Sequence, residues 1–356
     1  MKPHIRSTSR SILTMPSHNE IILAAAGTGK TTQLVKRIGQ LGNKRILVTT
    51  YTNQNTQLIK SLLYKKYGFL PPNILVLSWY TFLLRDGIRP FQNCLNIKAR
   101  IESVAWINKK PYHKKYDFIT QGNRVYRDKA TEFICECNAA SQGALIQRLE
   151  SIYDYIFIDE MQDLTGYDLT FLELLLNSKI SIWGVGDPRQ STLRTNYALK
   201  NKQYSKGTLI KWLKKQEKTG KLTLGQLNTC YRCRPSICNF ANQIFPDYPL
   251  MVSGNNSVVE SEGLVIIPLS QVDDYIKRYR PVVLRKWVIT DTKGYFAINI
   301  GIAKGKTFDR VLLFPTKPML NFIKNPQKNT DFKEKELLYV AVTRARYSVA
   351  IVDISI

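Results

Sequence analysis

The stretch "IILAAAGTGKTTQLVKRI", residues 21–38, joins a short apolar strand, a glycine-containing loop and the start of an amphipathic helix. Gly27 and Gly29 stand where a backbone curls round phosphate oxygens. Lys30 offers a positive charge to the β- and γ-phosphates, and the Thr31 hydroxyl is suited to bind Mg²⁺. The positive N-terminus of the helix points at the same anion. The stretch therefore predicts a nucleotide-binding P-loop, but such loops serve several classes of protein.

The regions around this loop alternate between strand and helix patterns. Apolar strands are expected at residues 20–25, 45–51, 73–79, 153–160 and 180–187, with helices at 31–41, 55–67 and 169–177. Strands this apolar, separated by helices, indicate an α/β fold with a parallel sheet covered on both faces. We therefore assign residues 1–84 and 150–221 to a first domain.

Two further regions depart from this unit. Residues 85–149 include "NKKPYHKKYDFITQGNRVYRDK", which is basic, contains tyrosines and lacks strand–helix alternation, so a small basic insertion into the first domain is expected. Residues 222–356 carry strand candidates at 264–269, 281–286, 310–315 and 347–355, which predict a second, smaller α/β domain.

Charge and cysteine content narrow the class of protein. The chain of 356 residues has 52 Lys+Arg against 27 Asp+Glu, a net charge of +25 that favours a polyanionic partner, although a solubility bias would give the same excess. No apolar run approaches the roughly 18 residues that span a bilayer, and the N-terminus has no signal-peptide pattern, so a cytoplasmic protein without a membrane partner is expected. Cys230, Cys233 and Cys238 superficially resemble a metal cluster, but no second Cys or His pair accompanies them, and free thiols are expected.

Two acidic residues end a hydrophobic strand in "YIFIDEMQDL", residues 155–164. One carboxylate, Asp159, is suited to hold Mg²⁺, and the second, Glu160, is then free to deprotonate an attacking water. A strand that runs into an acidic turn is the structural alternative. Together with the P-loop the pair favours hydrolysis of the nucleotide. Gln190, in "WGVGDPRQST", follows the next strand, where an amide is able to contact both γ-phosphate and water. By itself this segment is an ordinary turn.

Arginines occur in two segments of the second domain. "LNTCYRCRPSICNFAN", residues 227–242, contains Tyr231 and Arg232, and "ELLYVAVTRARYSVAIV", residues 336–352, contains Arg344 and Arg346. Arginines delivered from one domain to a γ-phosphate held on another stabilise the charge of the transition state. Surface salt bridges are the default reading for isolated arginines.

The complete set of motifs resembles that of UvrD/Rep-type superfamily 1 DNA helicases, in a compact form. The matching segments are "AAAGTGKTT", "ILVTTYTNQN", "IFIDEMQDL", "GVGDPRQS", "CYR" with "FAN", "IAKGKTFDRVLL" and "LLYVAVTRAR", between about residues 20 and 350. The resemblance implies two RecA-like domains that sandwich ATP and Mg²⁺, single-stranded or tailed duplex DNA across their tops, and movement from 3′ to 5′.

The resemblance also implies roles for individual residues. The catalytic group would comprise Glu160 as base, Gln190 as γ-phosphate sensor, and Arg232 and Arg344 as arginine fingers. Thr31 and Asp159 would hold the metal. The nucleotide would contact Ala24, Ala25, Ala26, Gly27, Thr28, Gly29, Lys30, Thr31, Thr32 and the ring of Tyr231. The nucleic acid would contact Tyr51, Thr52, Asn53, Tyr80, Arg194 and Tyr197. For Tyr51 the alternative is an ordinary aromatic residue at a strand end.

Four departures from the family pattern leave alternatives open. "SILTMPSHNE" lacks the glutamine that reads adenine, Thr195 stands where a base-stacking tryptophan is usual, and Thr307 replaces an acidic residue. About 60 residues separate Asn242 from Lys304, too few for the family's large accessory subdomain. A translocase without productive unwinding and a nucleotide-gated sensor therefore remain alternatives, RNA is not excluded, and no protein partner is indicated.

Overall fold

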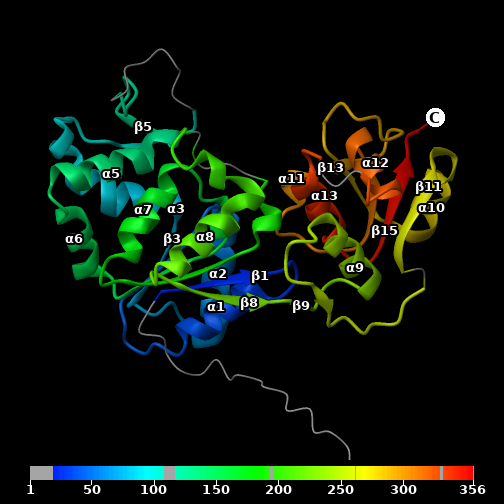
Figure 1. Cartoon of the computed structure of the whole chain (residues 1–356), viewed down its shortest axis with the longest axis horizontal. Coiled ribbons are helices and arrows are strands. Elements are labelled where there is room, and N and C mark those ends of the chain that lie inside the picture. The colour runs from blue at the N-terminus through cyan, green and yellow to red at the C-terminus, as the bar shows by residue number, and fades with distance from the viewer. Residues whose placement is uncertain are drawn as a thin grey trace, which may run out of the picture.

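The chain folds into two α/β domains that lie side by side, with the P-loop domain on the left and the second domain on the right (Figure 1). The computed structural model describes residues 19–107, 117–192, 196, 198–260, 262–328 and 332–355. Across these residues no helix is long and apolar enough to cross a membrane.

The first domain is built on a six-stranded sheet in the order β3-β2-β6-β7-β1-β8, with every neighbouring pair parallel. The strands are β1 (Glu20–Ala24), β2 (Ile46–Thr50), β3 (Ile74–Ser78), β6 (Tyr155–Ile158), β7 (Ser181–Gly186) and β8 (Thr223–Leu227). The parallel α/β sheet expected from the sequence is confirmed. The P-loop leaves the sheet at the carboxyl end of β1, between β7 and β8.

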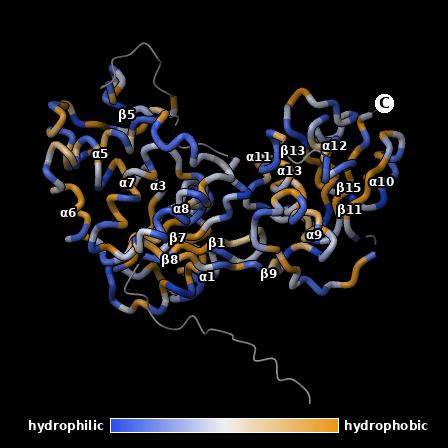
Figure 2. The backbone as a smooth tube through the Cα atoms, in the orientation of Figure 1, coloured by the Kyte–Doolittle hydropathy of each residue, from blue (hydrophilic) through white to orange (hydrophobic). Residues whose placement is uncertain are grey.

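Alternating apolar residues cover both faces of this sheet. Ile22 and Ala24 of β1 pack toward α1 (Lys30–Ile38) and α2 (Asn53–Tyr67) on one face. Ile21 and Leu23 point to the opposite face, which is covered by α3 (Trp79–Phe82), α5 (Ala130–Ala140), α7 (Tyr167–Leu176) and α8 (Leu209–Lys218). Hydrophobic stretches accordingly gather at the sheet in Figure 2.

The expected insertion is largely helical and shares the core of the first domain. A π-helical turn (Leu83–Ile88) and α4 (Arg89–Phe91) precede the short parallel pair β4 (Ser103–Ala105) and β5 (Arg124–Tyr126). Next come α5 and α6 (Ala144–Ile152), which lie at the far left of Figure 1. Phe133 and Ile134 of α5 are buried with Phe171 of α7, so the insertion is part of the first hydrophobic core.

The second domain is built on a five-stranded parallel sheet in the order β11-β15-β14-β12-β13. Its strands are β11 (Gly263–Pro268), β12 (Val282–Arg285), β13 (Ala297–Asn299), β14 (Phe308–Phe314) and β15 (Ala345–Asp353). One face packs on α9 (Pro235–Ile244), α11 (Ile300–Ala303), α12 (Lys317–Lys324) and α13 (Lys335–Val342), and the other packs on α10 (Val272–Tyr279).

The last strand of the first sheet lies beyond residue 221, where the sequence places the end of the first domain. Strand β8 pairs with β1 along its whole length, from Glu20 opposite Thr223 to Ala24 opposite Leu227. The chain then crosses to the second domain through the short strand β9 (Thr229–Cys230), which pairs with β10 (Val252–Ser253). The residues that cross between the domains are therefore the "CYR" segment itself.

Candidate active site

The P-loop has the backbone conformation that its glycines permit. Gly27 and Gly29 have φ angles of 74° and 75°, and Gly29 is the residue before the first turn of α1. A Cβ atom on Gly27 would lie 2.7 Å from Cys230 Sγ and 2.8 Å from Arg232 Cβ. The Tyr231 backbone N–H donates to the Gly27 carbonyl at 3.0 Å. The loop is therefore packed directly against the "CYR" segment, about 200 residues away in the chain.

A cavity of about 320 Å³ opens above the P-loop and contains residues from both domains. Of the residues expected to act in catalysis or nucleotide binding, ten line it: Gly27, Thr28, Gly29, Lys30, Thr31, Thr32, Glu160, Gln190, Arg232 and Arg344. Asn55, Leu58 and Leu62 of α2 form part of its wall, which the motifs did not indicate. Ala24, Ala25 and Ala26 are buried in the cores beneath the loop and do not line the cavity.

Two adjacent carboxylates follow β6, of which Glu160 lines this cavity and Asp159 does not. Burial and the neighbouring charge of Glu160 raise the pKa of Asp159 to about 7. Burial alone would raise the pKa of Glu160, but Lys304 and Lys30 bring it below its ordinary value. A buried Asp159 carboxylate beside the half-buried Glu160 fits a site for Mg²⁺, which takes one or two protein oxygens together with nucleotide phosphates. In the described residues there is no cluster of three or more His, Cys, Asp or Glu side chains that would hold a metal alone.

Lys304 connects the two domains at these carboxylates. Its Nζ lies 2.8 Å from both carboxylate oxygens of Asp163 and 3.7 Å from Glu160 Oε2. Burial would lower the pKa of Lys304, but Asp163 and Glu160 raise it above its ordinary value. Lys304 follows α11 of the second domain, whereas both carboxylates belong to the first. This ion pair therefore fixes how the second domain sits against the catalytic carboxylates.

We expect Lys304→Ala to weaken the docking of the two domains by about 3–5 kcal/mol, because it removes the cation that pairs with the buried Asp163 carboxylate across the domain boundary. Small-angle scattering should show a larger radius of gyration, and Tm should fall. Asp163→Asn in the same chain should partly restore the radius of gyration and the Tm, because it removes the carboxylate charge that Lys304 balances. Lys306→Ala, which deletes a lysine charge two residues away, should change neither the radius of gyration nor the Tm. An unchanged radius of gyration and Tm in Lys304→Ala would contradict this role.

Gln190 and Arg344 meet across the cavity. Arg344 Nη2 donates to Gln190 Oε1 at 3.0 Å, and its Nε donates to the Val340 carbonyl at 3.1 Å. Burial and the nearby Arg232 guanidinium lower the pKa of Arg344 to about 10. A buried guanidinium with a cationic neighbour favours an anion between them. The two residues come from different domains and are 154 positions apart in the sequence.

A buried network holds Gln190 in place, and the sequence motifs did not reveal it. Asp187 accepts hydrogen bonds from Gln190 Nε2 at 2.9 Å, from Arg189 Nε at 2.8 Å and from the Tyr339 hydroxyl at 2.9 Å. The Ala26 backbone N–H donates to the same hydroxyl at 3.3 Å. Tyr339, from α13 of the second domain, thus connects the P-loop to the loop that carries Gln190.

Gln162 has a corresponding role beside Glu160. Its amide nitrogen donates to Glu160 Oε2, and its amide oxygen accepts the Asp187 backbone N–H at 3.0 Å. A Cβ atom on Gly186 would lie 2.5 Å from Gln162 Oε1, so a larger residue there would displace the Gln162 amide. Within "DEMQD", Gln162 therefore orients the carboxylate of Glu160.

The two expected residues of the "CYR" segment lie in different environments. Arg232 lines the cavity and donates from Nη1 to the Thr343 carbonyl at 3.0 Å, directly beside Arg344. The Tyr231 side chain is 68% exposed and does not line the cavity, so its expected stacking on adenine stays a prediction.

Two of the expected nucleic-acid contacts, Tyr51 and Tyr80, belong to an aromatic cluster at the carboxyl ends of β2 and β3. The Tyr51 and Tyr80 hydroxyls are 3.0 Å apart, and the Tyr80 and Trp106 ring centroids are 5.2 Å apart. Tyr80 is buried, so it orients Tyr51 and offers no free face, whereas Trp106, which the motifs did not indicate, is exposed.

The remaining expected nucleic-acid contacts lie around α2 or outside the described residues. The Thr52 hydroxyl caps α2 by accepting the Asn55 N–H, and Asn53 is the exposed first residue of that helix. Arg194 and Tyr197 lie outside the described residues.

Cys230, Cys233 and Cys238 belong to the packing of the second domain. All three are buried free thiols in its core, and the Cys233 backbone N–H donates to Cys230 Sγ at 3.3 Å. They pack beside the P-loop but contribute no side chain to the cavity.

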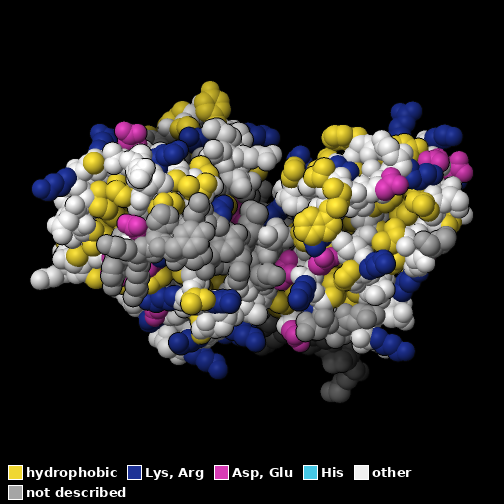
Figure 3. Space-filling view, turned by 90° about the horizontal axis from the view of Figure 1, so that it is seen from above, with side chains coloured by type: hydrophobic (Ala, Val, Ile, Leu, Met, Phe, Trp, Pro, Cys, Tyr) yellow, Lys and Arg dark blue, Asp and Glu magenta, His cyan; other side chains and the backbone are white. Residues whose placement is uncertain are grey.

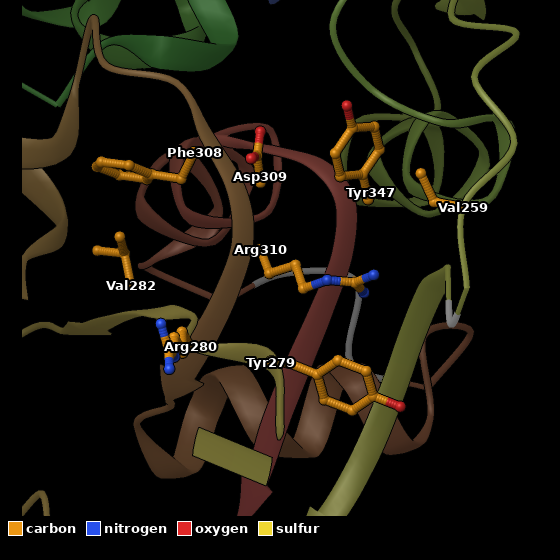
Figure 4. A pocket seen from close by; sticks show the side chains of 8 residues that line it. All are labelled: Val259, Tyr279, Arg280, Val282, Phe308, Asp309, Arg310 and Tyr347. Carbon is orange, nitrogen blue, oxygen red and sulfur yellow. The ribbon is translucent and has the colours of Figure 1, made fainter. Parts of the chain in front are cut away.

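A second cavity, of about 470 Å³, lies within the second domain at the amino ends of β14 and β15 (Figure 4). In this view the Arg310 side chain extends toward the Tyr279 ring, and Tyr347 and Asp309 point away from it. The Arg310 guanidinium lies 4.9 Å from the Tyr279 ring centroid and donates to Ser348 Oγ at 2.8 Å. None of the expected site residues lines this cavity.

Two family profiles match the chain. A profile of the viral superfamily 1 RNA helicase core domain matches residues 123–353, and a profile of an AAA domain matches residues 9–195. A comparison with curated proteins gives no match.

One solved helicase structure shares the fold at low sequence identity, and two more are similar at lower TM-scores. Arterivirus nonstructural protein 10 (helicase) has a TM-score of 0.50 at 18% identity, over 94% of this chain and 59% of that chain. The PRRSV helicase has a TM-score of 0.46 at 18% identity, over 94% and 52%. A complex of arterivirus nonstructural protein 10 (helicase) with DNA has a TM-score of 0.48 at 17% identity, over 95% and 61%. This chain thus spans between 52% and 61% of the length of these structures.

Two parallel-sheet domains, with a P-loop and paired carboxylates on one and arginines on the other, define a P-loop NTPase with two RecA-like domains. The chain belongs to the viral superfamily 1 RNA helicase core family, and so to the superfamily 1 helicases. The superfamily expected from the motifs is confirmed. The matching profile describes viral RNA helicases, and the finer UvrD/Rep assignment is not shown.

Proposed function

We propose that this chain is a nucleic-acid-stimulated ATP hydrolase that moves along a single strand and unwinds duplex ahead of it. The observation that supports this most strongly is the contact between Arg344 and Gln190, in the cavity that Lys30 and Glu160 also line. Residues from two domains that converge on the position of a γ-phosphate make closure of the cleft depend on the nucleotide. A protein that converts hydrolysis into movement requires this coupling.

In this proposal each cavity residue has a stated task. The P-loop backbone and Lys30 hold the phosphates, and Thr31 and Asp159 would hold Mg²⁺, which neutralises phosphate charge when bound. Glu160, kept ionised by Lys304 and Lys30, accepts the proton of the attacking water at its carboxylate. Gln190 orients that water, and Arg232 and Arg344 stabilise the charge that develops on the γ-phosphate.

The proposed substrate is a single strand, with movement from 3′ to 5′. The UvrD/Rep resemblance supports DNA and this direction, whereas the matching profile describes viral RNA helicases, so DNA and RNA are both to be tested. The net charge of +25 supports either polymer.

A second candidate is translocation without productive unwinding. Between Asn242 and Lys304 the described residues form β10, β11, α10, β12, β13 and α11, all of which belong to the second domain. Along this described stretch there is no room for an accessory subdomain that would engage the duplex.

The test is a strand-displacement assay with 3′-tailed and 5′-tailed duplexes of DNA and RNA, run beside ATP hydrolysis with and without single strands. We expect single strands to stimulate hydrolysis and only the 3′-tailed duplex to be unwound. A preference for the 5′ tail would reverse the direction and leave the helicase proposal standing. Stimulated hydrolysis without displacement would favour the second candidate, and unstimulated hydrolysis would contradict both.

A further inference from the structure

Arg189 belongs to the first domain, but its side chain is buried against two tyrosines of the second. It lies in a 3₁₀ turn (Pro188–Gln190) after β7 and is 4% exposed. Its guanidinium carbon lies 5.0 Å from the centroid of the Tyr339 ring and 5.3 Å from that of the Tyr248 ring. Tyr339 belongs to α13 and Tyr248 follows α9, so both rings come from the second domain. The motifs assign no role to Arg189.

The two tyrosine rings are held in place by a third aromatic residue, and we call Phe245, Tyr248 and Tyr339 the aromatic socket. The Phe245 ring lies edge-on to both tyrosines, with its centroid 5.7 Å from each of theirs. The Tyr248 hydroxyl donates to the Gly207 carbonyl of the first domain at 2.6 Å. Aromatic faces attract a cation, and most strongly where water is excluded. The socket therefore favours a guanidinium that has lost its hydration.

Arg189 is connected to the Gln190 amide through one carboxylate. Arg189 Nε donates to Asp187 Oδ1 at 2.8 Å, and Gln190 Nε2 donates to Asp187 Oδ2 at 2.9 Å. Asp187 is fully buried. Burial would raise the pKa of Asp187, but the charges of Arg189 and Lys30 bring it below its ordinary value. The anion that positions Gln190 is therefore kept charged in part by Arg189.

The interface between the domains is open beside the aromatic socket. A cavity of about 810 Å³ there is lined by Ile210 and Lys211 of α8 from the first domain and by Tyr248 from the second. Seen from above, a notch divides the two domains over part of their line of contact (Figure 3). Arg189 therefore makes a close contact next to an unfilled part of the interface. A shift of the second domain would expose Arg189 to water, in which its bond to Asp187 is weaker.

We propose that Arg189 is a positioning residue that makes the orientation of Gln190 depend on the place of the second domain. With the aromatic socket docked, Arg189 holds Asp187, and Asp187 holds the Gln190 amide. When the socket withdraws, water reaches the guanidinium and the Tyr339 hydroxyl no longer bonds Asp187, so the amide is released. This inference rests on the proposed function, because it presumes that binding of a single strand moves the domains during hydrolysis.

The experiment measures kcat and KM for ATP hydrolysis by the full chain, with and without oligo-dT or oligo-U. Arg189→Met keeps an unbranched side chain and removes its charge. We expect the stimulated kcat to fall by about 10- to 10²-fold, the cost of a slightly misplaced catalytic group. KM for ATP should stay near its wild-type value, because the P-loop keeps its contacts. A loss of structure alone would not divide the two constants in this way.

A double-mutant cycle tests whether Arg189 acts through Gln190. In a Gln190→Ala background, Arg189→Met should cost almost nothing further, because the group that Arg189 positions is already gone. Two losses that multiply would mean that the residues act independently, and the inference would be overturned. The cycle needs only hydrolysis without a strand.

Tyr248→Leu tests the aromatic socket from the second domain and leaves no buried charge unpaired, so it serves even where Arg189→Met does not fold. It should lower the stimulated kcat in the same direction, whereas Tyr248→Phe keeps the ring and should retain the rate. Equal rates in Tyr248→Leu and the wild type, or equal losses in Tyr248→Leu and Tyr248→Phe, would overturn this inference alone. Wild-type hydrolysis that single strands do not stimulate would overturn the proposed function instead.

Discussion

Glu160→Gln is expected to lower the rate of ATP hydrolysis by about 10²- to 10⁴-fold, the usual contribution of a general base. Glutamine keeps the shape of the side chain and its place beside Gln162 and Lys304, but it cannot accept the proton of the attacking water. The P-loop, Lys30 and the metal-binding oxygens are untouched, so nucleotide binding should persist. Binding of a single strand should therefore still respond to ATP while turnover stops.

The measurement pairs steady-state phosphate release with anisotropy of a labelled single strand, with and without ATP. Glu173→Gln serves as the control, because Glu173 is a partly exposed carboxylate on α7 that pairs with Lys221, remote from the cavity. It should hydrolyse ATP at the wild-type rate. Wild-type turnover in Glu160→Gln would assign the base to another residue, and Asp163 would be the first to test.

The sheets and the P-loop were predictable because their signals are local. Apolar runs such as residues 46–50 and 155–158 are buried on both faces of a parallel sheet, which leaves a pattern that a single sequence shows. Strand β8 was missed because "TLGQL" is short, contains a glycine and lies at the edge of its sheet, where only one side pairs. Its membership depends on pairing with β1, about 200 residues earlier.

The sequence of the insertion contains apolar residues at helical spacing, but its basic composition led us to expect an irregular segment. Phe133, Ile134 and Cys137 recur at helical spacing and are fully buried. The neighbouring run of lysines and tyrosines favoured an irregular segment, although α5 packs on α7 as part of the first core.

The residues that support the site could not be found from motifs, because their partners are remote in sequence. Lys304 meets Asp163 across 141 positions, and Tyr339 meets Asp187 across 152. Tyr339 lies in the apolar run "LLYVAV", where an aromatic residue is typical of the buried face of a helix. Only the juxtaposition of the two domains gives its hydroxyl a function.

Arg344→Ala is expected to cost the most, about 10³- to 10⁵-fold in the rate of ATP hydrolysis, if it supplies positive charge to the γ-phosphate in the transition state as proposed. The guanidinium is fully buried, and it contacts Gln190 from the opposite domain. Arg344→Ala removes both the positive charge and the hydrogen bond to Gln190, which forms only when the two domains are together. Single strands should consequently no longer stimulate the residual hydrolysis. Binding of the nucleotide should change far less, because the P-loop keeps its contacts.

Arg346→Ala is the matched control, since it deletes the same side chain two residues later. Arg346 is about half exposed and pairs with the exposed Asp309 at 2.8 Å, an ion pair of the kind that contributes little to stability. It should retain the wild-type rate and its stimulation. Arg344→Lys separates the two roles of Arg344, because lysine keeps the charge but cannot bond Gln190 and the Val340 carbonyl in the same geometry. If Arg344→Ala and Arg346→Ala lose activity equally, the effect is one of net charge, and the proposed arginine finger is wrong.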